Sequence, residues 1–266
     1  MQIEIIFIGI FAGLFAGMFG VGGGIVIIPA LILIFGWEMH LTAGTTLATL
    51  LFPTGILALL QYKRANLLNI KVSALIALGI VFGNIFGATV ALQVDGEFLK
   101  QLFGVFLIFI GIKHLKILQF FKNKKNEIID EKQDDSLIDF QKTSKQILIF
   151  TGIITGFLAG LFGIGGGIII VTILIGIYKI NPKQAVAISL AAMFLPVGIG
   201  GVLLYNQANF VNILAAIKIA IGMEIGSAIS AKIAIGIDIA LLKRLFGFML
   251  ILLGLYFISE KYIFGW

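Results

Sequence analysis

The chain has 266 residues, of which 60% are hydrophobic and only 12% are charged, and its mean hydropathy is +1.12. This composition excludes an ordinary soluble domain and indicates a polytopic membrane protein. The formal charge of +6 fits Lys- and Arg-rich cytoplasmic loops better than a nucleic-acid partner. The chain has no cysteine, and its histidines are His40 and His114, so cysteine-rich and histidine-rich metal sites are excluded. We expect no metal and no other cofactor.

The first apolar segment, 4–36, is too long for one straight transmembrane helix, which needs about 20 apolar residues. It carries a cluster of glycines near its middle. We predict two short helices that meet at a break, either as a hairpin that dips into the membrane or as a discontinuous helix. The segments that follow predict membrane-spanning helices at 42–62, 72–93 and 98–117.

The same unit then recurs along the chain. GLFAGMFGVGGGI (13–25) returns as GFLAGLFGIGGGI (156–168), and the same offset of 143 residues pairs prolines, asparagines and glycines over about a hundred residues. Chance does not keep register for so long, so we interpret the chain as a duplication. The halves are 3–118 and 146–261, joined by a polar cytoplasmic linker, 119–145, that is a solvated tether or in part helical. The second half predicts a broken segment at 147–178 and spans at 185–204, 213–232 and 242–258.

The basic residues distinguish two topologies. If each opening segment is a hairpin, each half crosses the membrane an odd number of times and the second half is inverted. Lys63, Arg64, Lys179 and Lys183 then lie in the cytoplasm and the uncharged loop 205–212 lies outside, as the positive-inside rule requires. If each opening segment crosses once, Lys179 and Lys183 lie outside. We therefore predict an all-α membrane protein built as an inverted repeat.

The glycines of the opening segments have more than one interpretation. Those at GxxxG spacing predict close helix packing; they are Gly9, Gly13, Gly17, Gly152, Gly156 and Gly160. A nucleotide-binding glycine loop would need a preceding strand and a later acidic residue, and the context is apolar helix on both sides.

The denser glycine clusters predict a binding site. Non-helical backbone at membrane depth is tolerated only where protein buries it or a watery cavity faces it, and a helix that starts after a break presents N–H groups to anions. Two such breaks from inverted halves would face each other near the midplane, where secondary transporters bind substrate. The alternative is a purely architectural break. The candidate substrate-binding glycines are Gly20, Gly22, Gly23, Gly24, Gly163, Gly165, Gly166 and Gly167.

Few polar side chains remain inside the predicted spans. Paired positions carry Thr46 with Ser189 and Asn84 with Ser227. These groups can donate to an oxyanion and line a cavity, but they can equally bond to their own helix or a neighbouring one. We take all four as candidate substrate-binding residues.

Glu224 lies mid-span in 213–232, and its counterpart in the first half is Val81. An ionisable side chain at that depth is a candidate functional residue, so we interpret Glu224 as a candidate proton-coupling carboxyl. The alternative is a structural ion pair, for example with Lys218.

Other paired residues have mainly structural interpretations. Pro53 and Pro196 predict kinks in the middle of their spans. Residues where spans leave the membrane predict interfacial anchors and helix caps; they are Tyr62, Asn66 and Asn69 with their counterparts Tyr205, Asn209 and Asn212.

The pattern GxxxGxxGxGGG followed by Pro29, AGTTL at 43–47, YKRAN at 62–66 and the whole-chain duplication resemble the TauE/SafE family of sulfite exporters and related permeases. The resemblance covers nearly the whole chain outside the linker. It implies transport of small sulfur-containing or organic anions, such as sulfite, across the cytoplasmic membrane of a prokaryote by a multi-pass protein. One departure is that Thr172 stands in the second half where Pro29 stands in the first, so the two glycine breaks need not be equivalent.

The expected function is therefore a secondary transporter whose partners are a small anion and the lipid bilayer, with a homo-oligomer left open. A passive anion channel is a close alternative, and a membrane scaffold would explain the GxxxG stripes but not two glycine breaks. An intramembrane enzyme would need a nucleophile with a base or a metal cluster, and neither is evident. We predict that the chain is not an enzyme.

Overall fold

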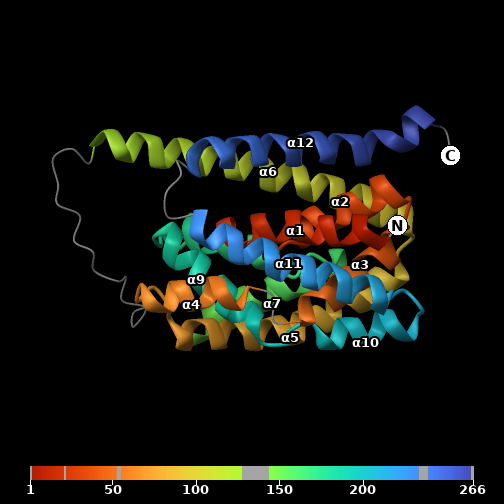
Figure 1. Ribbon diagram of the computed structural model, residues 1–266, viewed down its shortest axis with the longest axis horizontal. Coiled ribbons are helices and arrows are strands. Elements are labelled where there is room, and N and C mark those ends of the chain that lie inside the picture. Colours follow the sequence, from red (N-terminus) through yellow and green to blue (C-terminus); the bar gives the residue numbers. More distant parts are fainter. Residues whose placement is uncertain (1, 21, 53–54, 128–143, 234–238, 265–266) are drawn as a thin grey trace. The chain divides into compact units, whose positions relative to one another are not determined.

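The computed structural model describes residues 2–20, 22–52, 55–127, 144–233 and 239–264, and over these ranges it contains helices and no strand (Figure 1). The predicted all-α class is confirmed. In chain order the helices are α1 (Gln2–Phe19), α2 (Gly24–Phe35), α3 (Met39–Leu51), α4 (Ile56–Arg64), α5 (Ile70–Gln93), α6 (Gly96–Glu127), α7 (Lys145–Phe162), α8 (Gly167–Gly176), α9 (Pro182–Phe194), α10 (Ile199–Gln207), α11 (Ile213–Ile233) and α12 (Ile239–Phe264).

The chain divides into two compact units, each of which takes segments from both predicted halves. Unit 1 comprises 1–96 and 140–236, and unit 2 comprises 97–139 and 237–266. Unit 1 therefore contains α1 to α5 and α7 to α11, while unit 2 contains α6 and α12. The predicted repeats, 3–118 and 146–261, and the linker between them describe how the sequence was duplicated and not how the chain packs, so these boundaries stay a prediction. Of the linker, the first residues continue α6 as far as Glu127, and 128–143 lie outside the described residues.

Glycines break both opening segments, as predicted. In the first break Gly20, Gly22 and Gly23 have φ of 66°, 75° and 73°. In the second, Gly163, Gly165 and Gly166 have φ of 80°, 75° and 89°. Glycine adopts this left-handed backbone without the steric cost that a Cβ imposes, so α1 and α7 end here, and Gly23 and Gly166 stand directly before α2 and α8.

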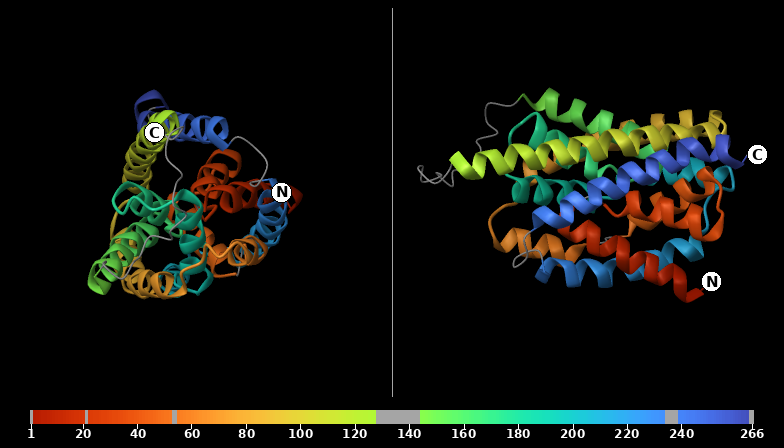
Figure 2. Two further views of the ribbon diagram at one scale, coloured as in Figure 1. Left: turned by 90° about the vertical axis from the view of Figure 1, so that its left-hand side faces the viewer. Right: turned by 90° about the horizontal axis from the view of Figure 1, so that it is seen from above.

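The GxxxG glycines allow very close helix packing in unit 1, which confirms their predicted role. Helix α1 lies along α11 (Figure 1), and α7 lies along α5 (Figure 2). A Cβ added to Gly13 would lie 2.7 Å from the Cα of Met223, and one added to Gly156 would lie 2.7 Å from the Cα of Ile80. Both contacts join backbone to backbone, so no side chain can be inserted without separating the helices. Each opening helix thus packs against a helix of the other sequence half.

Two predicted spans are not continuous helices. Over 42–62 the chain forms α3 and then α4, and over 185–204 it forms α9 and then α10, with an angle of 51° between that second pair. The sequence predicted a kink within one helix at each proline, but in the structure the helix ends near it and a new one begins, because the backbone of neighbouring residues also departs from helical geometry. Gly55, which precedes α4, has φ of 90°, and Leu195, which follows α9, has extended backbone. Pro53 itself lies outside the described residues.

Three described helices are long and apolar enough to cross a membrane: α5, α7 and the part of α11 from Ile213 to Ser230. The bent pair of α9 and α10 would make a fourth span. Large apolar side chains cover their outer surfaces: Phe86 on α5 and Phe150 on α7 are 68% and 61% exposed. Aromatic rings exposed in this way on an outer surface favour contact with lipid over contact with water.

Of the predicted caps, Asn69 and Asn212 are confirmed and act in the same way in both halves, whereas the predicted interfacial anchor Tyr205 is fully buried and its hydroxyl donates to the carbonyl oxygen of Gly160. The side chain of Asn69 accepts from the N–H of Val72 (3.2 Å), and that of Asn212 accepts from the N–H of Ala215 (3.0 Å). Each amide satisfies one N–H of a helical first turn. The repeat that is visible in the sequence is thus also present in local geometry.

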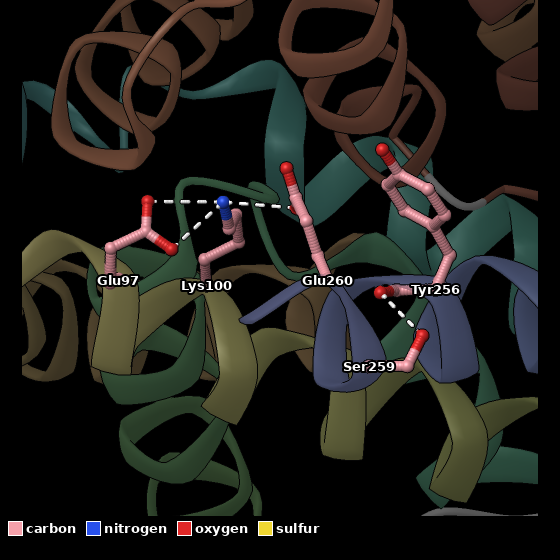
Figure 3. Close-up of polar contacts among 5 residues, drawn as sticks. All are labelled: Glu97, Lys100, Tyr256, Ser259 and Glu260. Carbon is pink, nitrogen blue, oxygen red and sulfur yellow. Dashed lines mark hydrogen bonds and ion pairs between the residues drawn. The ribbon is translucent and has the colours of Figure 1, made fainter. Parts of the chain in front are cut away.

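Unit 2 is a close pair of helices. A Cβ on Gly104 of α6 would lie 2.8 Å from the carbonyl oxygen of Gly254 on α12. Near the same end, the Lys100 ammonium group lies 2.9 Å from a Glu97 carboxylate oxygen on its own helix and 3.0 Å from Glu260 on α12 (Figure 3). The predicted spans 98–117 and 242–258 are therefore helical and paired with each other.

Candidate functional site

The two glycine breaks pack against each other inside unit 1. A Cβ on Gly24 would lie 2.7 Å from both the Cα and the carbonyl oxygen of Ile164, which belongs to the second break. Each break also packs against a helix of the other half: Gly20 against Val186 on α9, and Gly163 against Ala43 on α3. These two contacts are related by the offset of 143 residues. The arrangement brings all eight predicted glycines into one region.

Ser189 joins the two breaks directly. Its hydroxyl lies 3.0 Å from the carbonyl oxygen of Gly20 and 3.2 Å from that of Gly167, and donates toward both. The counterpart Thr46 is fully buried, and its hydroxyl has no hydrogen-bond partner in the part of the chain that the structure describes. The two hydroxyls that the repeat pairs therefore have different surroundings: one is committed to backbone carbonyls and the other is unsatisfied.

Two small cavities adjoin the breaks. The Asn84 cavity is lined by Leu47, Leu50, Ile80, Asn84, Gly165, Met193, Val197 and Gly198. The Ser227 cavity is lined by Ala16, Gly17, Gly22, Leu50, Gly55, Leu190, Met193, Met223 and Ser227. Their volumes, measured as room for the centre of a water molecule, are about 10 Å³ and about 20 Å³. Each therefore has room for about one water molecule, and the site is closed to a larger anion.

The cavities correspond to each other through the duplication. The offset of 143 residues relates six pairs of lining residues: Leu47 and Leu190, Leu50 and Met193, Ile80 and Met223, Asn84 and Ser227, Gly22 and Gly165, and Gly55 and Gly198. Because the pairs connect one cavity with the other, we treat them as two halves of one site.

Leu50 and Met193 line both cavities and form their common wall. A Cβ on Gly22 would lie 2.6 Å from the terminal methyl of Met193, and one on Gly165 would lie 2.9 Å from the same methyl. The wall thus lies between the two breaks and consists of flexible side-chain ends. Sequence reasoning missed both residues, because a leucine and a methionine in an apolar span carry no chemical signal of their own.

Asn84 is the most informative polar residue of the site. Its side chain is 1% exposed, and its Oδ1 accepts from the N–H of Gly201 in the first turn of α10 at 2.9 Å. A backbone N–H requires an acceptor, so this bond fixes which end of the amide is oxygen. The Nδ2 group has no partner among the described residues. Ser227, in contrast, donates to the carbonyl oxygen of Glu224 at 3.0 Å.

Glu224 lies beside the Ser227 cavity, half-buried. Its Oε2 accepts from the N–H of Gly55 at 2.8 Å, directly before α4. A carboxylate at this place is stabilised by the N-terminal end of the helix dipole. Within the described ranges no group of three or more His, Asp and Glu is placed to hold a metal ion. The side chains that the structure brings to this site with hydrogen-bonding groups are thus the amide of Asn84, the hydroxyl of Ser227 and, beside them, the carboxylate of Glu224.

Comparison with known proteins gives a consistent result. The family model described as sulfite exporter TauE/SafE matches residues 5–257. The chain is 33% identical over 245 residues to a probable membrane transporter protein of Methanocaldococcus jannaschii, covering 88% of this chain and 85% of that protein. It is 29% identical over 269 residues to the probable membrane transporter protein YunE of Bacillus subtilis, covering 96% and 97%. No solved structure matches the chain significantly.

Proposed function

We propose that this chain, which belongs to the sulfite exporter TauE/SafE family, is a secondary transporter of small sulfur-containing or organic anions such as sulfite. It is a multi-pass membrane protein, and its relatives are named as membrane transporters rather than enzymes. The observation that carries the proposal is the pair of corresponding cavities on either side of one apolar wall. A protein that alternates between two accesses needs a site that each half can reach in turn.

We propose that Leu50 and Met193 are the part of the site that moves. Each cavity has room for about one water molecule, so a sulfite ion fits only when this wall is displaced. Flexible side-chain ends can move at little cost, since methionine in particular adapts its shape readily. The breaks on either side hold the backbone in place and present helix N-termini, which favour an anion.

Two contacts support the hairpin form of the opening segments and hence the inverted repeat. A Cβ on Gly23 would lie 3.4 Å from the carbonyl oxygen of Ala12, and one on Gly166 would lie 3.5 Å from that of Thr155. Ala12 and Thr155 each lie about two turns before the end of their helix. A chain that continued straight through the break would not return to them. We therefore propose that both segments turn back as re-entrant hairpins.

The test is uptake of ³⁵S-labelled sulfite into proteoliposomes that contain the purified full chain, with and without a pH gradient. A transporter gives uptake well above that of empty liposomes, and saturation at high sulfite separates it from a channel. Labelled sulfonates and simple carboxylates extend the survey of substrates. If no small anion enters, a scaffold becomes the better interpretation.

Glu224 remains the proposed proton-coupling residue, because protonation of its carboxyl would weaken the bond from the N–H of Gly55. The helices that pack most closely against α11 carry Glu4 on α1, His40 on α3, and Tyr62, Lys63 and Arg64 on α4 as further ionisable residues, and α11 itself also carries Lys218 and Lys232. The variant Glu224→Gln keeps an acceptor for Gly55 but cannot take up a proton. Uptake that still follows the pH gradient in this variant would end the coupling proposal.

A further inference from the structure

We infer that the two half-sites have unequal roles: the transported anion binds in the Asn84 cavity at the start of α10, while the carboxylate of Glu224 occupies the corresponding place at the start of α4. This inference rests on the proposed function and specifies where its substrate binds. It makes the halves of the site chemically different although the duplication relates them.

The occupied half-site shows what this geometry accepts. Gly55 precedes α4, a helix of 9 residues, and its N–H points to the Glu224 carboxylate at 2.8 Å. The carboxylate is the protein's own oxyanion at a helix N-terminus. A substrate entering this half-site would meet that negative charge and would have to displace it. The hydroxyl of Ser227 is already committed to the Glu224 carbonyl oxygen, so it offers the substrate no free proton.

The other half-site has the same plan without the carboxylate. Val81 stands where the duplication would place Glu224, and Gly198 stands where it would place Gly55. The backbone conformation also differs between the two half-sites, since φ is 90° at Gly55 and −87° at Gly198. The start of α10 therefore lacks an internal anion at the position that Glu224 fills at the start of α4.

Asn84 provides the second, independent sign of a missing ligand. Its oxygen is held by the N–H of Gly201, so the amide cannot rotate to satisfy its other end without losing that bond. The Nδ2 group lies in a side chain that lines the cavity, is almost completely buried, and has no acceptor within the described ranges. A buried donor of this kind is unfavourable until an acceptor arrives. An oxyanion oxygen is such an acceptor.

The lining of the cavity restricts the ligand class. Apart from Asn84 and two glycines, the lining side chains are apolar and none is charged. A cation would find no carboxylate among these lining side chains. A large polar solute would leave its groups unpaired in an apolar cavity. The chemistry that fits is a small oxyanion that takes one N–H bond from Asn84 beside the N-terminal end of α10.

The decisive variant is Asn84→Asp. It keeps an oxygen that accepts from the N–H of Gly201, so the attachment of α10 is preserved, but it replaces the donor with an acceptor and adds negative charge. We expect sulfite uptake to fall by about ten- to a hundredfold, the range for a lost hydrogen bond to a charged group. Thr89→Val, on the exposed face of the same helix, is the matched control and should transport normally.

A second pair of variants uses the duplication itself. Val81→Glu introduces into the open half-site the carboxylate that Glu224 supplies to the other, and it should act as an internal competitor that abolishes uptake. Val81→Gln adds similar volume without the charge and should retain most of the uptake. If Asn84→Asp fails to fold and insert, as judged by size-exclusion chromatography of the purified protein, this second pair still tests whether the substrate binds in the Asn84 cavity.

The outcomes separate the inference from the proposed function. If the unaltered chain transports no labelled anion, the proposed function itself fails. If it transports sulfite and Asn84→Asp does so at the same rate, the assignment of the substrate to the Asn84 cavity is overturned. Equal uptake by Val81→Glu and Val81→Gln would overturn it in the same way. Uptake lost in Asn84→Asp and Val81→Glu but kept in their controls supports it.

Discussion

Replacing Gly165 with leucine tests whether the glycine breaks serve transport as well as architecture. Gly165 has φ of 75°, and a Cβ there would contact the terminal carbons of Leu50 and Met193, the latter at 2.9 Å. The left-handed backbone costs a residue with a Cβ about 1–2 kcal/mol. The obstructing atoms are flexible side-chain ends, so the helices themselves need not separate. Against a total stability of about 5–15 kcal/mol, the variant should still fold and insert.

Its transport should nevertheless be lost. The adjoining cavity has a volume of about 10 Å³, which cannot hold a leucine side chain, so the new side chain must occupy the space between Leu50 and Met193. We expect sulfite uptake at the background of empty liposomes, with a thermal unfolding temperature only moderately lowered. Gly22→Leu should behave in the same way, because Gly22 has φ of 75° and faces the same methyl of Met193.

Two control variants separate strain from obstruction. Gly36 has φ of 64° and no described atom within 4 Å of its added Cβ, so Gly36→Ala carries the conformational cost alone and should transport normally. Gly163→Ala would drive its Cβ to 2.6 Å from the carbonyl oxygen of Ala43, a backbone atom, and should prevent folding. Wild-type transport by Gly165→Leu would refute the proposed role of the break, because obstruction of the wall would then have no effect.

Further predictions concern topology and packing. Thiol-labelled tags placed at 66 and at 207 should react from opposite sides of the membrane, and labelling from one side would refute the inverted repeat. Gly13→Ala should destabilise the protein by at least about 3 kcal/mol, since its Cβ meets the backbone of α11, whereas Gly176→Ala has open space among the described atoms and should leave the unfolding temperature unchanged. Lys100→Met should lower stability by about 1–3 kcal/mol in the same assay, because the Lys100 side chain is only 10% exposed and its removal leaves Glu260, which is 29% exposed, without its partner; an unchanged unfolding temperature would show that this ion pair does not hold α6 to α12.

The glycine breaks could be predicted from the sequence because their cause lies in the residues themselves. A backbone with positive φ at membrane depth requires glycine, and the duplicated clusters mark both places. The caps at Asn69 and Asn212 were predictable for the same reason, since a capping side chain acts within its own turn. Local chemistry of this kind is readable from one sequence.

The rest of the site depends on contacts between distant segments. The wall of Leu50 and Met193 is a product of packing, and the only sequence signal for it was that the two positions are paired by the duplication. The free end of the Asn84 amide depends on Gly201 of α10, and the commitment of Ser189 depends on carbonyls of both breaks. The spans 42–62 and 185–204 were predicted as kinked helices, because hydropathy shows where a segment is apolar and not where its helix stops.

The exchange of partners between the two halves also has a consequence for how the protein is made. Helix α1 is synthesised well before α11, the helix against which its glycine-lined face packs, because α11 follows only after α10. Until α11 is made, that face lacks the helix against which it packs, and neither half can complete its own interior. Contacts so distant in sequence delay folding. An isolated first half should therefore not complete its folding, because α1 has to remain without its packing partner α11 until most of the chain has been translated.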